Sequence, residues 1–272
     1  MSAGSGRVAR MACAAFALVL AVPAVAAAQD QPPSCPPGAV VAGTPGADTL
    51  VGTAADDRIN GLAGEDNIIG LTGSDCILGG GEFDTVQGGP GADTIFGEGT
   101  DDDLSGGSDA DRIFGGEGFD FIDGGIGDDI LRGESGPDDV SGANGDDVIG
   151  GGDGFDFLSG GIGFDRIVGG GSRDDITGGN GEDRLSGSAG NDRISGGLDG
   201  DTISGGSGRD RIDGGDGRNR ISGGSGNDVI DAANGSVERI RCGSGDRDVV
   251  RADANDRLRG CERVFRLDLV DP

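Results

Sequence analysis

A nine-residue period runs without interruption from Gly43 to Asp231. Cut at this period, the segment gives 21 windows, and three typical ones read GGSDADRIF, GGNGEDRLS and GGSGRDRID. The first residue of every window is Gly, and the eighth is Ile, Leu or Val. The sixth is Asp in every window except one, where it is Asn219. A period this regular indicates a chain that folds by stacking equivalent units.

The spacing of the aliphatic residues excludes an amphipathic helix and favours short strands. A helix face needs an apolar residue every three or four positions, and these windows offer one in nine. One inward side chain per short strand, flanked by outward seventh and ninth residues, satisfies the pattern. The Gly-Gly-x-Gly start of the window suits chain reversal, because glycine adopts backbone conformations that other residues avoid. We therefore predict stacked loop–strand units whose aliphatic side chains form two thin inward ladders.

The composition agrees with stacking rather than with a compact core. The 272 residues include 61 Gly, and the only aromatic residues are ten Phe, so few large side chains could fill a core. The net charge is −28, and the segment from residue 43 to residue 231 alone carries −29. Such a surface repels nucleic acid and anionic lipid, and it suits a hard multivalent cation. We expect no nucleic-acid partner and no membrane insertion.

These windows resemble the RTX family (repeats in toxin, haemolysin-type calcium-binding repeats), whose unit is G-G-x-G-x-D-x-U-x with U aliphatic. The resemblance covers residues 43–231, about seventy per cent of the chain. It implies an all-β fold, a right-handed parallel β-roll (a β-solenoid) of 21 nonapeptide repeats with two repeats per turn. It also implies calcium ion binding at multiple Ca²⁺ sites between stacked loops. The ligands would be the sixth side chain and the carbonyl groups of the glycine-rich segment.

Two windows per turn would place alternate sixth residues on opposite edges of the roll. Without a cation these are rows of like charges about 5 Å apart, which destabilises the fold. Asp also favours turns unaided, but that preference does not explain one fixed offset in twenty windows. We expect poorer sites in the first windows, because Gly52-Thr-Ala-Ala-Asp-Asp57 lacks two loop glycines. One predicted edge holds Asp48, Asp66, Asp84, Asp102, Asp120, Asp138, Asp156, Asp174, Asp192, Asp210 and Asp228, and the other holds Asp57, Asp75, Asp93, Asp111, Asp129, Asp147, Asp165, Asp183, Asp201 and Asn219.

The two ends of the chain differ from the repeats. Residues 1–28 have two early arginines, an apolar run and a small-residue stretch, which predicts a secretory signal peptide and an extracellular protein. A membrane anchor is the alternative, but the apolar run is short and Pro23 interrupts it. We interpret residues 29–42 as an N-terminal cap segment. Residues 232–272 mix charged and β-branched residues, which predicts a small β-rich C-terminal cap.

Four cysteines remain after removal of the predicted signal, and an even number in an exported protein suggests disulfides. Cys242 and Cys261 are 19 residues apart, close to one 18-residue turn of the roll. A disulfide between adjacent turns is therefore predicted there. Cys35 would then pair with Cys76, which occupies an outward seventh position. Free thiols are the alternative for each pair.

The sequence argues against an enzyme. It has no His, which excludes a Ser-His-Asp triad and an HExxH zinc site, and only about forty residues flank the repeats on each side. The predicted N-terminal signal also departs from toxin-type RTX proteins, which use an uncleaved C-terminal signal, so a toxin function is not carried over. Two functions remain, a calcium-stabilised extracellular rod or spacer and a calcium-dependent adhesion or recognition module.

A row of phenylalanines bears on the second of these functions. Phe83, Phe119 and Phe155 all occupy the fifth position of their windows and are spaced by 36 residues. Phe121 and Phe157 repeat the same offset at the outward seventh position. An exposed apolar row predicts a contact for self-association or for a cell-surface partner. Duplication of a four-window block explains the same offset without any partner.

Overall fold

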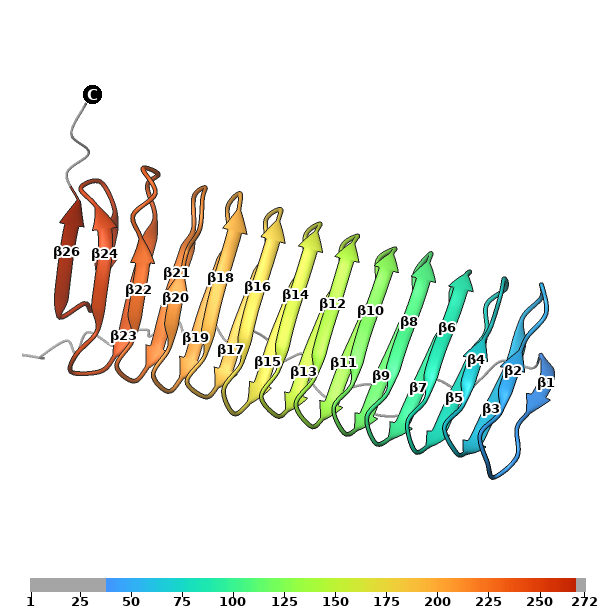
Figure 1. The fold of residues 1–272 in the computed structure, drawn as a ribbon. Coiled ribbons are helices and arrows are strands. Elements are labelled where there is room, and N and C mark those ends of the chain that lie inside the picture. The colour runs from blue at the N-terminus through green and yellow to red at the C-terminus, as the bar shows by residue number, and fades with distance from the viewer. Residues whose placement is uncertain (1–37, 268–272) are drawn as a thin grey trace, which may run out of the picture. The chain divides into compact units, whose positions relative to one another are not determined.

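The computed structural model describes residues 38–267, which form strands and loops only (Figure 1). The strands alternate between two parallel sheets of 13 strands each, so that every turn contributes one strand to each sheet. The predicted all-β parallel solenoid is confirmed, and it has about 13 turns. No helix in the described residues is long and apolar enough to cross a membrane.

The odd-numbered strands form one sheet and the even-numbered strands form the other. The first sheet contains β1 (Ala39–Ala42), β3 (Asp57–Ala63), β5 (Cys76–Gly81), β7 (Thr94–Gly99), β9 (Arg112–Glu117), β11 (Ile130–Ser135), β13 (Val148–Asp153), β15 (Arg166–Gly171), β17 (Arg184–Ala189), β19 (Thr202–Ser207), β21 (Arg220–Ser225), β23 (Arg239–Ser244) and β25 (Arg257–Arg259). The second contains β2 (Thr49–Val51), β4 (Asn67–Ile69), β6 (Thr85–Pro90), β8 (Asp103–Ser108), β10 (Phe121–Ile126), β12 (Asp139–Asn144), β14 (Phe157–Ile162), β16 (Asp175–Asn180), β18 (Arg193–Leu198), β20 (Arg211–Asp213), β22 (Val229–Ala232), β24 (Val249–Asp253) and β26 (Arg263–Leu267).

The core consists of the two predicted aliphatic ladders. Every eighth-position residue from Leu50 to Ile230 is buried, and Ile240 and Val250 extend the ladders into residues 232–267, the described part of the predicted C-terminal cap, which we call the cap below. Equivalent residues of successive turns pair across the sheet, as Ile122 does with Leu104 on one side and Val140 on the other. Burying about one large side chain per strand is enough, because each turn packs on the turns before and after it.

The strands run further than the sequence predicted. A regular strand covers positions seven to nine of one window and the first three of the next, as in Phe121–Ile126. The first glycine of the window is therefore a buried strand residue, and the reversal falls at positions four to six. A side chain at the first position has no room. A Cβ atom on Gly97 would lie 2.5 Å from Oδ2 of Asp102 and 2.5 Å from the carbonyl oxygen of Gly115.

The glycines at positions two and four suit a backbone with positive φ angles. Both positions have positive φ angles, as at Gly125 (100°) and Gly136 (126°). The same conformation persists where another residue replaces glycine, with φ 76° at Glu134 and 79° at Asp109. Glycine is preferred because other L-residues enter this region at a cost.

The cysteines agree with the prediction in part. Cys242 and Cys261 form the predicted disulfide, with a Cα–Cα distance of 5.1 Å. Cys76 is also in a disulfide, whereas Cys35, its predicted partner, lies outside the described residues. Cys76 is fully buried, which the sequence did not predict, whereas Arg58 and Thr94, its neighbours in register on the same face of the sheet, are not. Engagement of its sulfur in the disulfide distinguishes it from those neighbours.

Candidate calcium-binding columns

The sixth-position aspartates stack into two columns, one on each edge of the roll. The backbone N–H of each donates to Oδ1 of the equivalent residue one turn later, as from Asp102 to Asp120 (2.9 Å) and from Asp111 to Asp129 (2.8 Å). These contacts continue at intervals of 18 residues along both columns, from Asp48 and Asp57 onward. The structure thus aligns each of the two predicted sets of residues in its own column, one on each edge of the roll.

The second carboxylate oxygen of these residues has no protein partner. Within the described residues, Oδ2 is buried and accepts no hydrogen bond in every sixth-position aspartate from Asp66 to Asp228. A buried, unpaired oxygen costs free energy even when it is uncharged, and far more when it is charged. Two continuous rows of such atoms require either protons or a bound cation.

The single exception, Asn219, reveals what surrounds this position. Its Oδ1 accepts the N–H of Asp201 (2.8 Å), as an aspartate would. Its Nδ2 occupies the place of the unpaired oxygen and donates to the carbonyl groups of Gly214 (2.9 Å) and Asp216 (3.3 Å). The loop therefore presents carbonyl oxygens to this point. An aspartate places another acceptor among them, which suits a hard cation.

Burial without a cation also raises the pKa values of the column aspartates. Burial, with a smaller contribution from stacked carboxylates, raises the pKa of Asp111 and of Asp120 to about 8. It raises the pKa of Asp102 to about 7 and that of Asp228 to about 6. The donated backbone N–H opposes the rise in pKa, but burial is the larger effect. A cation that supplies positive charge would keep these groups ionised near neutral pH.

The first two windows supply donors to the Oδ2 atoms of their aspartates, although Oδ1 of Asp57 is buried without a hydrogen-bond partner among the described residues. The N–H of Thr44 donates to Oδ2 of Asp48, and the N–H and hydroxyl of Thr53 donate to Oδ2 of Asp57. Asp48 is also only half-buried. Because these oxygens already have donors, they have less need of a cation. Poorer calcium sites in the first windows stay a prediction.

The columns continue into the C-terminal cap, which the nine-residue pattern did not predict. On one edge Asp228 donates its N–H to Asp248, and Asp248 donates to Glu262. On the other edge Glu238 donates to Asp256. The strand offsets change there to 19 residues between β21 and β23 and to 20 between β22 and β24. A shorter sequence pattern would have identified these acids, because each of them stands two residues before an aliphatic residue, as the sixth residue of a repeat does.

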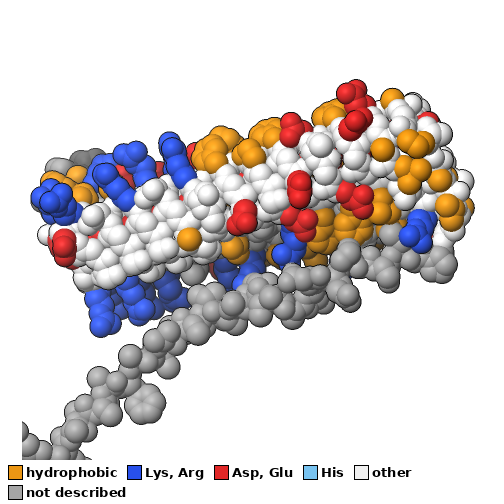
Figure 2. Space-filling model, turned by 90° about the horizontal axis from the view of Figure 1, so that it is seen from below, with side chains coloured by type: hydrophobic (Ala, Val, Ile, Leu, Met, Phe, Trp, Pro, Cys, Tyr) orange, Lys and Arg blue, Asp and Glu red, His pale blue; other side chains and the backbone are white. Residues whose placement is uncertain are grey.

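The predicted phenylalanine row lies along the edge and sheet of the even-numbered strands. Phe83, Phe119, Phe121 and Phe157 are 45–47% exposed, and Phe155 packs edge-on against Phe157 with ring centroids 4.8 Å apart. Figure 2 shows hydrophobic side chains spread over much of the face in view, whereas Arg side chains gather toward the C-terminal end.

Comparison with known families identifies the repeat. The family model described as "RTX calcium-binding nonapeptide repeat (4 copies)" matches nine overlapping or adjacent stretches: residues 42–75, 78–113, 105–140, 114–149, 123–158, 150–185, 168–203, 177–212 and 204–236. Together these stretches span most of the chain, and they end at residue 236, near the start of the C-terminal cap. No curated protein matches the chain.

Proposed function

The chain belongs to the RTX calcium-binding nonapeptide repeat family, whose repeats bind calcium in a β-roll, and from this premise we propose that its folding is coupled to Ca²⁺ and that it serves as an extracellular rod or spacer. The observation that carries the proposal is the pair of columns of buried, unpaired Oδ2 atoms from Asp66 to Asp228. Since these atoms are destabilising without a cation, calcium binding free energy becomes folding free energy.

The proposed ligands are the column carboxylates and the loop carbonyl groups that face them. Calcium takes six to eight oxygens at about 2.3–2.6 Å and tolerates irregular geometry, so two stacked loops could complete one site. Asn219 is the member of the predicted set that fits least well, because its amide nitrogen occupies the ligand position and its oxygen already accepts an N–H. We therefore retain it as a predicted column member but assign it no calcium.

The rod function follows from the architecture together with the predicted export. Stacked turns are spaced by about 4.8 Å, so the structure lengthens with each turn while its cross-section stays constant. The predicted signal peptide, residues 1–28, lies outside the described residues. If the protein is extracellular, it meets millimolar calcium, and an affinity per site of about 10⁻⁴–10⁻³ M would suffice.

A calcium titration of the purified protein tests this function. In chelator at pH 8 we expect the β-type circular dichroism spectrum to be lost, because the columns then carry uncompensated charge. Added calcium should restore it cooperatively, with heat uptake or release at more than one site in calorimetry. A β-type spectrum that excess chelator leaves unchanged would contradict the proposal, and magnesium provides the control for general screening of charge.

The exposed phenylalanine row supports a second candidate, a calcium-dependent contact with another copy of the chain or with a cell surface. Replacing Phe119, Phe121, Phe155 and Phe157 with Ser should then abolish a calcium-dependent oligomer measured by light scattering. Phe96 and Phe114, whose rings stack 5.0 Å apart on the opposite sheet, provide the matched control substitutions. A wild-type protein that stays monomeric and binds no cells in saturating calcium would exclude this function.

A further inference from the structure

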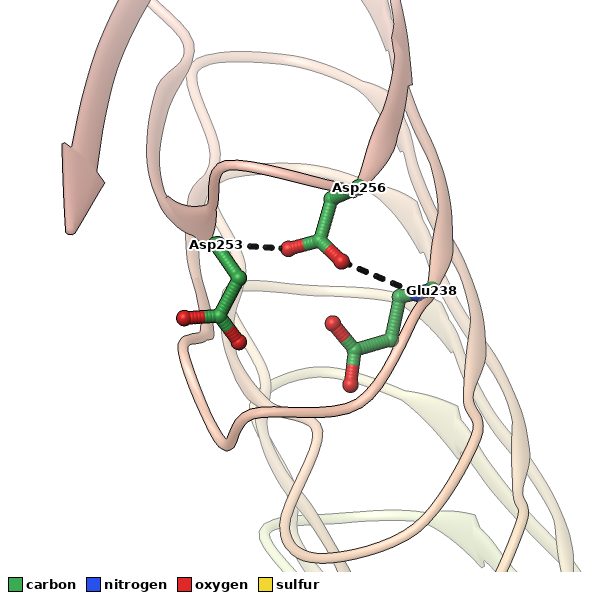
Figure 3. A group of neighbouring side chains, drawn as sticks. All are labelled: Glu238, Asp253 and Asp256. Carbon is green, nitrogen blue, oxygen red and sulfur yellow. Dashed lines mark hydrogen bonds between the residues drawn. The ribbon is translucent and has the colours of Figure 1, made fainter. Parts of the chain in front are cut away.

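Three buried carboxylates converge in the C-terminal cap, beyond residue 236, where the family match ends (Figure 3). Glu238 immediately precedes β23, Asp253 ends β24 and Asp256 immediately precedes β25. One oxygen of each lies within 4.8 Å of the others. This is the only group of three such side chains in the part of the chain that the structure describes.

Two members of this group have roles that need no ion. Oδ2 of Asp253 accepts the backbone N–H groups of Asn234 (3.1 Å) and Gly235 (2.6 Å). Asp256 accepts the N–H of Glu238 (3.0 Å) at Oδ1 and that of Asp253 (2.6 Å) at Oδ2. These bonds fasten the loop before β23 to the turn between β24 and β25.

Glu238 has no such role. Its side chain is fully buried, and neither Oε1 nor Oε2 forms a hydrogen bond of ordinary geometry within the described residues. Burial and the adjacent Asp256 raise the pKa of Glu238 to about 8, and the Asn234 side chain opposes that rise only in part. Figure 3 shows its carboxylate pointing toward the space beside Asp253 and Asp256. Burying a carboxylate against two others without a counter-charge is strongly destabilising.

None of the three carboxylates forms an ion pair within the described residues. The guanidinium of Arg266 donates to the carbonyl oxygens of Asp253 (2.6 Å) and Ala254 (2.8 Å), not to a carboxylate. Arg251, another cation of the cap, pairs with Asp231 instead. The positive charge that these three carboxylates require therefore has to come from outside the chain.

We propose that Glu238, Asp253 and Asp256 bind one Ca²⁺ ion in a cap site separate from the nonapeptide sites. The donors are all oxygen and come from three segments with irregular geometry, which suits calcium better than octahedral magnesium. No His or Cys belongs to the group, so it lacks the ligands that zinc prefers. Bound calcium would fix the loop before β23 against the turn before β25 and so close the C-terminal end of the roll.

The cap site does not rest on calcium binding by the repeats. Asn219 occupies the preceding turn of the same column, and its Nδ2 takes the ligand position there. Asn234 likewise donates Nδ2 to the carbonyl groups of Gly215 (2.6 Å) and Gly217 (3.1 Å). Two side-chain amides thus separate the cap carboxylates from the last aspartate of that column, Asp201.

Calcium stoichiometry of the full chain tests the cap site. Bound calcium would be measured by equilibrium dialysis and elemental analysis at saturating calcium for the wild type, Glu238→Gln and Asp256→Asn. Each variant should lose one ion per chain. Asp246→Asn removes the same charge from an exposed position of the cap and should lose none. Unchanged stoichiometry in Glu238→Gln would overturn the proposal and would indicate that a proton, not a cation, neutralises the cluster.

Two further results keep the test decisive. If a variant fails to fold in calcium, a crystal of the wild-type chain grown in calcium should show anomalous scattering between the three carboxylates, and a water molecule or the Arg266 side chain there would overturn the site. Failure of the proposed function looks different, since the wild type would then bind no ions in the repeats. Loss of repeat ions together with retention of one ion would leave the cap site standing alone.

Discussion

The repeats and the C-terminal cap both bury columns of carboxylates, but they differ in the donors that they offer to them. Both continue one pair of aliphatic ladders and one pair of acidic columns. In the repeats each column aspartate leaves one buried oxygen unpaired, as at Asp102, so the loops depend on an external charge. In the cap, Asp253 and Asp256 accept loop N–H groups at their carboxylates, and Glu238 and Asp248 are the cap acids that keep unpaired oxygens within the described residues. The calcium requirement therefore arises from missing donors rather than from the β-roll itself.

The disulfide of the cap is a further difference between the cap and the repeats. The disulfide between Cys242 and Cys261 ties β23 to the segment after β25, where the strands are short and the register is irregular. A disulfide stabilises chiefly by restricting the unfolded chain, independently of calcium. The repeats carry no equivalent within residues 77–241, where the sequence has no Cys. We therefore expect the cap to lose less structure than the repeats when calcium is removed.

The largest expected effect is that acid substitutes for calcium in the repeats. Burial raises the folded-state pKa from 3.8 to about 6 at Asp84, about 7 at Asp102 and about 8 at Asp111, so the folded roll binds more protons than the unfolded chain between pH 3.8 and about 8. Stability without calcium is therefore greatest near pH 4 and is lost as pH rises through about 8. Circular dichroism after calcium removal should show β structure at pH 5 and an unfolded repeat region at pH 8.

The same titration has the opposite consequence for calcium binding. Calcium needs ionised carboxylates, so its apparent affinity should fall as pH decreases below about 7, and binding should release protons. Calorimetry in buffers of different ionisation enthalpy measures that release. An apo protein whose unfolding does not depend on pH would show that the columns are not the destabilising element.

A second, smaller effect on stability is expected from replacing one column aspartate, Asp102, with its exposed neighbour Asp103 as the control. Asp102→Asn keeps the oxygen that accepts the N–H of Asp84 but replaces the unpaired oxygen with an amide. In calcium it should lose a ligand and destabilise the roll by about 1–3 kcal/mol, and in chelator it should stabilise the roll. Asp103→Asn, at an exposed position, should change either value by less than about 0.5 kcal/mol. Equal effects of the two substitutions in denaturant titrations would show that net charge alone matters.

Much of the fold followed from the sequence because stacking repeats one local solution. The ladders, the two columns and the 19-residue disulfide were all consequences of an 18-residue turn. The cap acids at Glu238 and Asp256 were not predicted, because their spacing leaves the nine-residue register. The burial of Cys76 and the amide orientation of Asn219 were also not predictable, since residue identity does not specify a partner or a side-chain rotamer.

The smallest expected effect comes from replacing Asn219, the one sixth-position residue that is not an aspartate, with aspartate. Asn219→Asp would replace the amide that donates to Gly214 and Asp216 with an unpaired oxygen facing the same carbonyl groups. In chelator the variant should therefore be less stable than the wild type. In calcium it should bind about one more ion and regain about 1 kcal/mol, the stabilisation expected when free calcium exceeds the dissociation constant several-fold.

The control for this substitution is Asn180→Asp, which adds the same charge at an exposed third position of a window. It should leave the calcium stoichiometry unchanged, because no loop carbonyl cluster faces a side chain that points into solvent. Stoichiometry and denaturant midpoint would be measured for both variants with and without calcium. An extra ion in Asn219→Asp alone would show that one amide-to-carboxylate exchange is what separates the two kinds of turn. No extra ion would mean that the loop around Asn219, with its short strand β20 (Arg211–Asp213), differs from the repeats in more than this side chain.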